Sequence, residues 1–179
     1  MTVTSERPRG LNAYVAFGAN LGDRADTILD AAAALAETDG VELVAIAPAL
    51  ESVAVKLEGL DPDAPRYLNT VAIVSTELSP ADLHAVLRHL EDVHGRVRGE
   101  RWGDRTLDLD LITYGDLTQD DPELTIPHPR AHERDFVLGP WREIDPDATL
   151  PGRGRVADLL ARLSDAERTA AADAEGNTP

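Results

Sequence analysis

Residues 67–95 read YLNTVAIVSTELSPADLHAVLRHLEDVHG, and they join a strand pattern to a helix pattern. Residues 67–77 are rich in valine, isoleucine and threonine, which is typical of a buried strand. Residues 79–82, Ser-Pro-Ala-Asp, then provide a helix N-cap, a proline in the first turn and an early acidic residue. Leucine and valine recur at helical spacing as far as Val93, and Gly95 ends the pattern. The stretch therefore predicts a strand followed at once by an amphipathic helix.

The flanking sequence adds three strands and another helix. Strand patterns cover 11–17, 41–50 and 106–114, a helix pattern covers 23–37, and a charged loop containing prolines covers 56–66. The resulting order, β-α-β-β-α-β, predicts a ferredoxin-like α+β sandwich with helices on one face of an antiparallel sheet. Additional C-terminal helices are expected at 136–143 and 156–172. We expect one domain at 11–172, between a flexible N-terminal extension at 1–10 and a flexible tail at 173–179.

Composition excludes several classes of function. The 179 residues carry a net charge of −16, with 33 acidic residues against 17 lysines and arginines, which disfavours a general nucleic-acid or membrane-surface role. The absence of cysteine excludes disulfides, thiolate metal sites and cysteine nucleophiles. The sequence contains neither a membrane-spanning apolar run nor the apolar core of a signal peptide, so we expect a cytoplasmic protein.

The segment 96–110 carries the residues that suggest chemistry. Four arginines lie within 96–105 although the chain as a whole is acidic, and arginine binds phosphate oxygens in a bidentate manner. Trp102 could stack on a flat heterocycle or anchor the base of the loop. Asp108 and Asp110 are two residues apart on a predicted strand, so both carboxylates project from one face while the neighbouring leucines point into the core. Such a pair suits Mg²⁺ bound to phosphates, although an ordinary solvent-facing strand has the same alternation.

Five blocks of sequence resemble the hydroxymethyldihydropterin pyrophosphokinase family of folate synthesis. They are Phe-Gly-Ala-Asn-Leu-Gly-Asp at 17–23, Tyr-Leu-Asn at 67–69, Arg-Trp-Gly-Asp-Arg-Thr-Leu-Asp-Leu-Asp at 101–110, Ile-Pro-His-Pro at 126–129 and Arg-Asp-Phe-Val-Leu at 134–138. The blocks follow the order of the family, and the resemblance runs from Ala13 to Asp147. It implies Mg²⁺-dependent transfer of pyrophosphate from ATP to 6-hydroxymethyl-7,8-dihydropterin, giving AMP and the pterin diphosphate. The enzyme is expected to be a monomeric pyrophosphokinase with these two small-molecule substrates.

The resemblance also implies roles for individual residues. Asp108 and Asp110 would hold two Mg²⁺ ions, and Arg96 and Arg105 would neutralise the transferred group. The residues that match ATP-contacting positions are Glu91, Arg98, Arg101, Trp102, Thr125, His128 and Arg134. The residues that match the pterin pocket are Asn20, Ser52, Val53, Val55, Tyr67, Asn69, Trp102 and Phe136. Each has a structural alternative: Glu91 could be a solvated acid, His128 a turn residue and Phe136 part of the core.

The chain departs from the family pattern at a few positions. Ala19 replaces the usual serine, Asp104 stands where proline is usual, and Glu123 occupies a position that is basic in some members. The segment from Arg96 to Trp102 is one residue shorter than common versions, and the match is weakest at 50–55. None of these differences removes the acidic pair.

Two other classes of function compete with this interpretation. A nucleotide-sugar transferase could use the Asp-x-Asp pair, but it would need a larger nucleotide-binding domain. A ferredoxin-like binding module could bind RNA or sense a small ligand, although an RNA-binding sheet is usually basic and rich in aromatic residues. A ligand sensor would not require Asp108 or Asp110.

Overall fold

The computed structural model describes residues 10–52, 54–56, 59–61, 66–95 and 106–176. Residues 1–9 of the expected N-terminal extension and 177–179 of the expected tail fall outside this part of the chain, whereas residues 173–176 belong to the last helix. The first half contains β1 (Leu11–Ala19), α1 (Arg24–Ala36), β2 (Val41–Ile46), β3 (Leu50–Ser52), β4 (Ala54–Lys56), β5 (Gly59–Asp61), β6 (Tyr67–Thr76) and α2 (Pro80–Val93). The second half contains β7 (Asp108–Tyr114), the 3₁₀ turn η1 (Ala131–Glu133), α3 (Asp135–Ile144), β8 (Thr149–Leu150), β9 (Gly154–Arg155) and α4 (Val156–Gly176).

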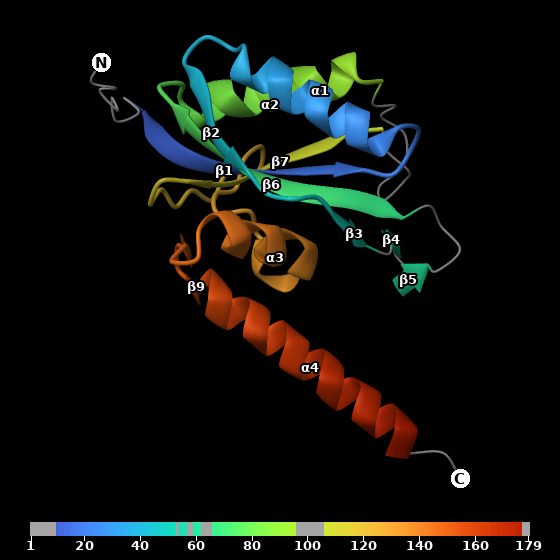
Figure 1. The fold of residues 1–179 in the computed structure, drawn as a ribbon. Coiled ribbons are helices and arrows are strands. Elements are labelled where there is room, and N and C mark those ends of the chain that lie inside the picture. Colours follow the sequence, from blue (N-terminus) through green and yellow to red (C-terminus); the bar gives the residue numbers. More distant parts are fainter. Residues whose placement is uncertain (1–9, 53, 57–58, 62–65, 96–105, 177–179) are drawn as a thin grey trace, which may run out of the picture.

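The main sheet has five strands in the order β2-β6-β1-β7, with β3 continuing along β6 after β2 (Figure 1). All of these pairs are antiparallel. The strand order places β1 and β6 at the centre of the sheet and β7 at one edge. The two helical crossovers, β1-α1-β2 and β6-α2-β7, complete the ferredoxin-like topology. The predicted α+β fold is confirmed.

The first core lies between the sheet and the pair α1 and α2, which cover one face (Figure 1). Phe17 of β1 is 1% exposed and packs with leucines of both helices. The Ser79 hydroxyl accepts a hydrogen bond from the amide of Asp82 at 3.1 Å, and Gly95 adopts a φ of +80° just after α2. The predicted start and end of this helix are therefore confirmed.

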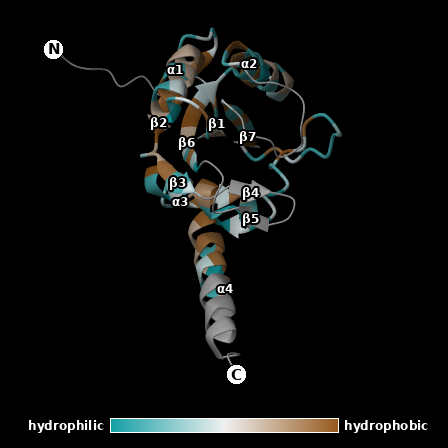
Figure 2. Ribbon diagram, turned by 90° about the vertical axis from the view of Figure 1, so that its right-hand side faces the viewer, coloured by the Kyte–Doolittle hydropathy of each residue, from teal (hydrophilic) through white to brown (hydrophobic). Residues whose placement is uncertain are grey.

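A second core covers the opposite face of the sheet, where α3 packs directly and α4 packs against α3 (Figure 1). Trp141 of α3 is fully buried, and its ring lies 4.7 Å from that of Tyr14 on β1. Apolar residues from the start of α4, Val156 and Leu159, complete this cluster, and Figure 2 shows the hydrophobic colouring where α4 meets the body of the protein. The C-terminal helices thus turn a two-layer sandwich into three layers.

Two short hairpins were not predicted. The segment 56–66, expected to be a loop, contains part of the β4–β5 pair, and β8 pairs with β9 before α4. Strands of two or three residues are too short to show a periodic pattern, so the sequence alone does not reveal them.

Among the helices that the structure describes, none has the length and apolar character needed to cross a lipid bilayer.

Candidate functional site

The site lies at the end of the sheet where β1 finishes and β6 and β7 begin. Gly18 of β1 is opposite Asn69 of β6 on one side and opposite Asp108 of β7 on the other. A central glycine therefore separates a buried amide, 6% exposed, from the acidic strand. Neighbouring strands are about 5 Å apart, so groups on β6 and β7 face a common space about 10 Å wide.

The acidic pair occupies one face of β7, as the sequence predicted. Leu107, Leu109 and Leu111 are buried in the first core, whereas Asp108 and Asp110 remain partly exposed on the alternate positions. The side chain of Asp110 is 30% exposed. The alternation places both carboxylates on the face of the sheet that α3 covers.

Two basic side chains converge on Asp110. Arg134, directly before α3, donates a hydrogen bond from Nη1 to Asp110 Oδ2 at 3.2 Å. His128 Nε2 lies 3.7 Å from the same oxygen. Both basic side chains are only 19% exposed, so the cluster is shielded from water on one side. The structure thus brings three of the predicted site residues into direct proximity.

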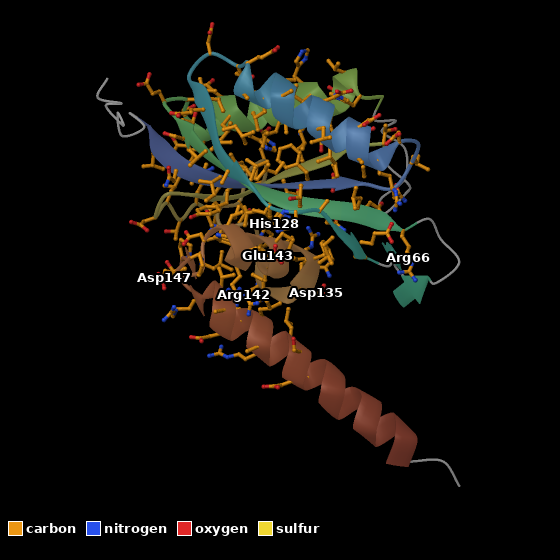
Figure 3. The ribbon with its side chains drawn as sticks, viewed as in Figure 1. Arg66, His128, Asp135, Arg142, Glu143 and Asp147 are labelled. Atoms are coloured by element: carbon orange, nitrogen blue, oxygen red, sulfur yellow. The ribbon has the colours of Figure 1, made fainter. Side chains whose placement is uncertain are left out.

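His128 is held by its backbone and by its ring. Its amide donates to the carbonyl of Ile112 on β7 at 2.8 Å, and its Nδ1 accepts a hydrogen bond from the amide of Arg130 at 3.2 Å. Figure 3 shows the residue at the level between the sheet and α3. Burial lowers the pKa of His128, and the nearby Arg134 lowers it further, against the opposing carboxylates of Asp110 and Asp108. A neutral ring that accepts at Nδ1 carries its proton on Nε2, which faces Asp110.

Arg134 also links the acidic pair to an aromatic ring. Its guanidinium carbon lies 5.8 Å from the ring centroid of Phe136, within the range of a cation–π contact. Phe136 is half-buried at the start of α3 and packs against the second core, so it has a structural role.

A polar group gathers on the β6 side of the site. Asn69 Nδ2 donates to Ser52 Oγ at 2.7 Å, because β3 pairs with β6 and places Ser52 opposite Tyr67. Asn20, which follows β1, is 3% exposed, and Tyr67 is half-buried. The predicted pterin-pocket residues Asn20, Ser52, Tyr67 and Asn69 therefore come from one end of the sheet.

Thr125 lines a cavity next to the acidic pair. Its hydroxyl donates to the carbonyl of Asp121, and it lines a cavity of about 390 Å³ together with His128, Ile126 and Arg153. His128 therefore borders both this cavity and the acidic pair.

Glu91 is not the solvated acid that one alternative suggested. It is 2% exposed, and its Oε1 accepts a hydrogen bond from the amide of Leu109 at 2.8 Å. Its predicted contact with a nucleotide stays a prediction.

Several predicted site residues lie outside the described residues: Val53, Arg96, Arg98, Arg101, Trp102 and Arg105. Val55 belongs to β4. The roles expected for these residues stay predictions.

Gly18 belongs to the motif at 17–23, but the sequence does not predict a part for it in the site. Its position is evident from the strand register, which places Gly18 between Asn69 and Asp108. That register depends on long-range pairing, which one sequence does not show.

The acidic pair suits a cation that takes most of its ligands from water and from a substrate. Within the part of the chain that the structure describes, no group of three or more histidine, aspartate or glutamate side chains is arranged to hold a metal ion. Mg²⁺ commonly uses one or two carboxylates and takes its other ligands from water and substrate phosphates. Two adjacent aspartates therefore suit an ion delivered with a phosphate-bearing substrate.

Comparison with known proteins identifies the class of the protein. A family model described as 7,8-dihydro-6-hydroxymethylpterin-pyrophosphokinase matches residues 14–146. The 2-amino-4-hydroxy-6-hydroxymethyldihydropteridine pyrophosphokinase of Haemophilus influenzae is 38% identical over 156 residues, covering 87% of this chain and 94% of the relative. The enzyme of the same name from Pseudomonas aeruginosa is 40% identical over 149 residues, covering 83% of this chain and 89% of the relative.

The chain also resembles solved structures. A crystal structure of Plasmodium falciparum HPPK-DHPS with pterin and p-hydroxybenzoate gives a TM-score of 0.70 at 15% identity. The match covers 92% of this chain and 45% of that longer chain, and at this low identity it supports the fold alone.

The protein is therefore an enzyme that transfers diphosphate, a pyrophosphokinase. More particularly, the chain belongs to the 7,8-dihydro-6-hydroxymethylpterin-pyrophosphokinase family. The resemblance inferred from the five sequence blocks is confirmed, and the binding-module alternative gives way to an enzyme.

Proposed function

We propose that the protein catalyses Mg²⁺-dependent transfer of pyrophosphate from ATP to 6-hydroxymethyl-7,8-dihydropterin. The hydroxymethyl oxygen attacks the β-phosphorus, the bond between that phosphorus and the oxygen bridging to the α-phosphorus breaks, and AMP leaves. The hydroxyl proton is released to solvent. The observation that carries the proposal is the position of Gly18, between the buried amide of Asn69 and the carboxylate of Asp108.

Asp108 and Asp110 would hold the metal, for which the family resemblance implies two ions. Bound Mg²⁺ would neutralise phosphate charge and orient the transferred group. Arg134 and His128, which already surround Asp110, lie where the phosphates of a nucleotide would bind. Arg134 offers permanently charged donors, and His128 offers a neutral N–H donor.

The pterin would bind on the β6 side of the site. A side-chain amide such as that of Asn69 can both donate to and accept from the polar edge of a pterin, and its bond to Ser52 fixes its orientation. Phe136 would stack on one face of the ring, with Trp102 on the other. Asn20 and Tyr67 would complete the pocket with Val53 and Val55.

Catalysis would depend on alignment and charge neutralisation. Among the described residues we identify no strong general base beside the expected position of the hydroxyl, and phosphoryl chemistry depends mainly on positioning and electrostatics. Arg96 and Arg105 would add positive charge, while Arg98, Arg101 and Thr125 would contact ATP. We further propose a cytoplasmic monomer.

The direct test is to incubate the purified protein with ATP, Mg²⁺ and 6-hydroxymethyl-7,8-dihydropterin and to resolve the nucleotide products. Pterin-dependent AMP is expected. Asp108→Ala and Asp110→Ala should each lower kcat by about a thousandfold or more, since both remove charge from the metal position. Asp116→Ala is the matched control, because Asp116 is an exposed acid just beyond the end of β7.

The alternative outcomes are distinct. Production of ADP would indicate transfer of a single phosphoryl group and would contradict the proposal. Pterin binding without any nucleotide turnover would favour the ligand-sensing alternative.

A further inference from the structure

The most informative group beside the acidic pair is the buried carboxylate of Glu91, in the last turn of α2. Its Oε1 accepts the amide proton of Leu109 at 2.8 Å, across a sequence separation of 18 residues. Leu109 is the residue between Asp108 and Asp110. This hydrogen bond therefore connects the end of α2 to the midpoint of the acidic pair.

The position of this bond follows from the place of β7 at the edge of the sheet. β7 pairs with β1 on one side, and successive amides of a strand point to alternate sides. Since the Leu109 amide points to Glu91, the amides of Asp108 and Asp110 point towards β1. Glu91 thus takes the place of a neighbouring strand as the acceptor for the Leu109 amide, which lies between the two aspartates and points away from β1.

The chemical identity of the residue supports a specific role. A carboxylate that is 2% exposed carries a large desolvation penalty unless hydrogen bonds compensate for it. An apolar side chain at this position would fill the same space without that penalty, but it would leave the buried amide of Leu109 without an acceptor. The requirement at position 91 is therefore for an acceptor at the edge of β7.

Resting on the function proposed above, we infer that Glu91 is a positioning residue, which fixes the backbone of β7 so that Asp108 and Asp110 present their carboxylates together to one cation. It acts through the Leu109 amide and does not touch the metal or the nucleotide. This role differs from the direct nucleotide contact that the family resemblance implies.

The test compares two substitutions of similar size. Glu91→Gln keeps an oxygen that can accept the Leu109 amide, whereas Glu91→Met fills the space without such an acceptor. Cation binding is followed by electron paramagnetic resonance, using Mn²⁺ with α,β-methylene-ATP, in which the scissile bond is blocked. Exchange of the Leu109 amide is followed by NMR in the same samples.

Glu91→Met should weaken Mn²⁺ binding by about tenfold or more, as removal of supporting groups around metal ligands does elsewhere. The Leu109 amide should exchange faster in this variant, while amides of α1 keep their protection. Glu91→Gln should bind Mn²⁺ within about threefold of the unaltered protein, because the hydrogen bond remains. Affinity for the pterin alone should not change in either variant.

Equal loss of Mn²⁺ binding in both variants would overturn the inference, because the charge or a direct contact would then matter. Unchanged Leu109 exchange in Glu91→Met would overturn it as well. If Glu91→Met does not fold, the test depends on Glu91→Gln. Retained Mn²⁺ affinity in this variant would support the inference, and lost affinity would overturn it. Because none of these measurements uses turnover, absence of pyrophosphokinase activity would refute the proposed function separately.

Discussion

Gly18 and Asn69 lie opposite each other in the β1–β6 ladder, and a Cβ atom on Gly18 would come within 3.2 Å of Asn69 Oδ1. That spacing is tighter than an ordinary van der Waals contact, so any side chain at position 18 displaces the amide. The φ of Gly18 is not in the left-handed region, which means that space rather than backbone conformation favours glycine here. The orientation of Asn69 therefore depends on glycine, which has no side chain, at position 18 of the neighbouring strand.

Gly18→Ala should weaken recognition of the pterin. The added methyl group moves the Asn69 amide by a few tenths of an ångström and strains its bond to Ser52, so kcat/KM for the pterin should fall about tenfold. Steady-state kinetics with the pterin varied at saturating ATP measures the effect. Gly139→Ala is the matched control, since a Cβ there meets no atom within 4 Å. Equal losses in both variants would show that the effect is not specific to Asn69.

Arg134→Gln should lower kcat/KM for ATP by about ten- to a hundredfold. The change removes the guanidinium group that donates a hydrogen bond to Asp110 and lies over the Phe136 ring. Hydrogen bonds between charged groups are stronger than those between neutral groups. Kinetics with each substrate varied in turn should show the larger effect on ATP. Arg130→Gln should change the same parameter less than about twofold, because its side chain forms a solvent-exposed ion pair with Glu133. A larger effect on the pterin would assign Arg134 to the other half of the site.

Tyr14→Phe should destabilise the protein without affecting catalysis. The Tyr14 hydroxyl donates to Asp145 at 2.5 Å, and losing this partly buried bond should lower the free energy of unfolding by about 1–2 kcal/mol. Urea denaturation at neutral pH measures the difference. Turnover should stay the same, because Tyr14 pairs with Thr113, near the opposite end of β7 from Asp108.

The same pair predicts an alkaline dependence. Burial, then the hydrogen bond and charge of Asp145, raise the pKa of Tyr14 well above its ordinary value of 10.0. The folded protein thus retains a proton that the unfolded chain loses above pH 10, so stability falls as pH rises through that range. The fall should be steeper in the unaltered protein than in Tyr14→Phe. Parallel curves would show that Tyr14 ionises alike in both states.

His84 predicts a dependence at acid pH. Burial lowers its pKa, as does the neighbouring Arg88, while Asp110 and Glu123 oppose the shift. Its Nδ1 is buried and has no hydrogen-bond partner among the residues that the structure describes. The unfolded chain then binds a proton that the folded protein resists, so stability is lost as pH falls below the ordinary value of 6.5. His84→Leu should reduce this loss. An NMR titration that gives His84 a pKa above 6.5 would contradict the prediction.

Local patterns predicted the parts of the fold that depend on near neighbours in sequence. The alternation around Asp108 and Asp110 placed both carboxylates on one face and the leucines in the core, and the structure confirms it. Ser79 caps its helix as expected, because the cap requires only the next three residues. Periodicity and capping are properties of short segments, and a single sequence displays them directly.

Long-range pairing determined what the sequence did not predict. The hydrogen bond between Ser52 and Asn69 requires β3 to align with β6. The contact between Tyr14 and Trp141 joins residues that are far apart in the sequence. The buried Glu91 accepts the Leu109 amide only because α2 packs against the edge strand β7. These arrangements depend on the packing of whole elements, which helical and strand periodicities do not specify.

The second core has a consequence for anyone who shortens this chain or fuses it to another. The family match ends at residue 146, yet Leu150, Val156 and Leu159 beyond it cover Trp141 beneath α3. A chain cut at the family boundary would expose that indole to water and loosen the helix that begins beside Arg134. A fusion joint that leaves the buried cluster intact has to lie beyond Leu163, the last apolar residue packed against it among the side chains that the structure describes.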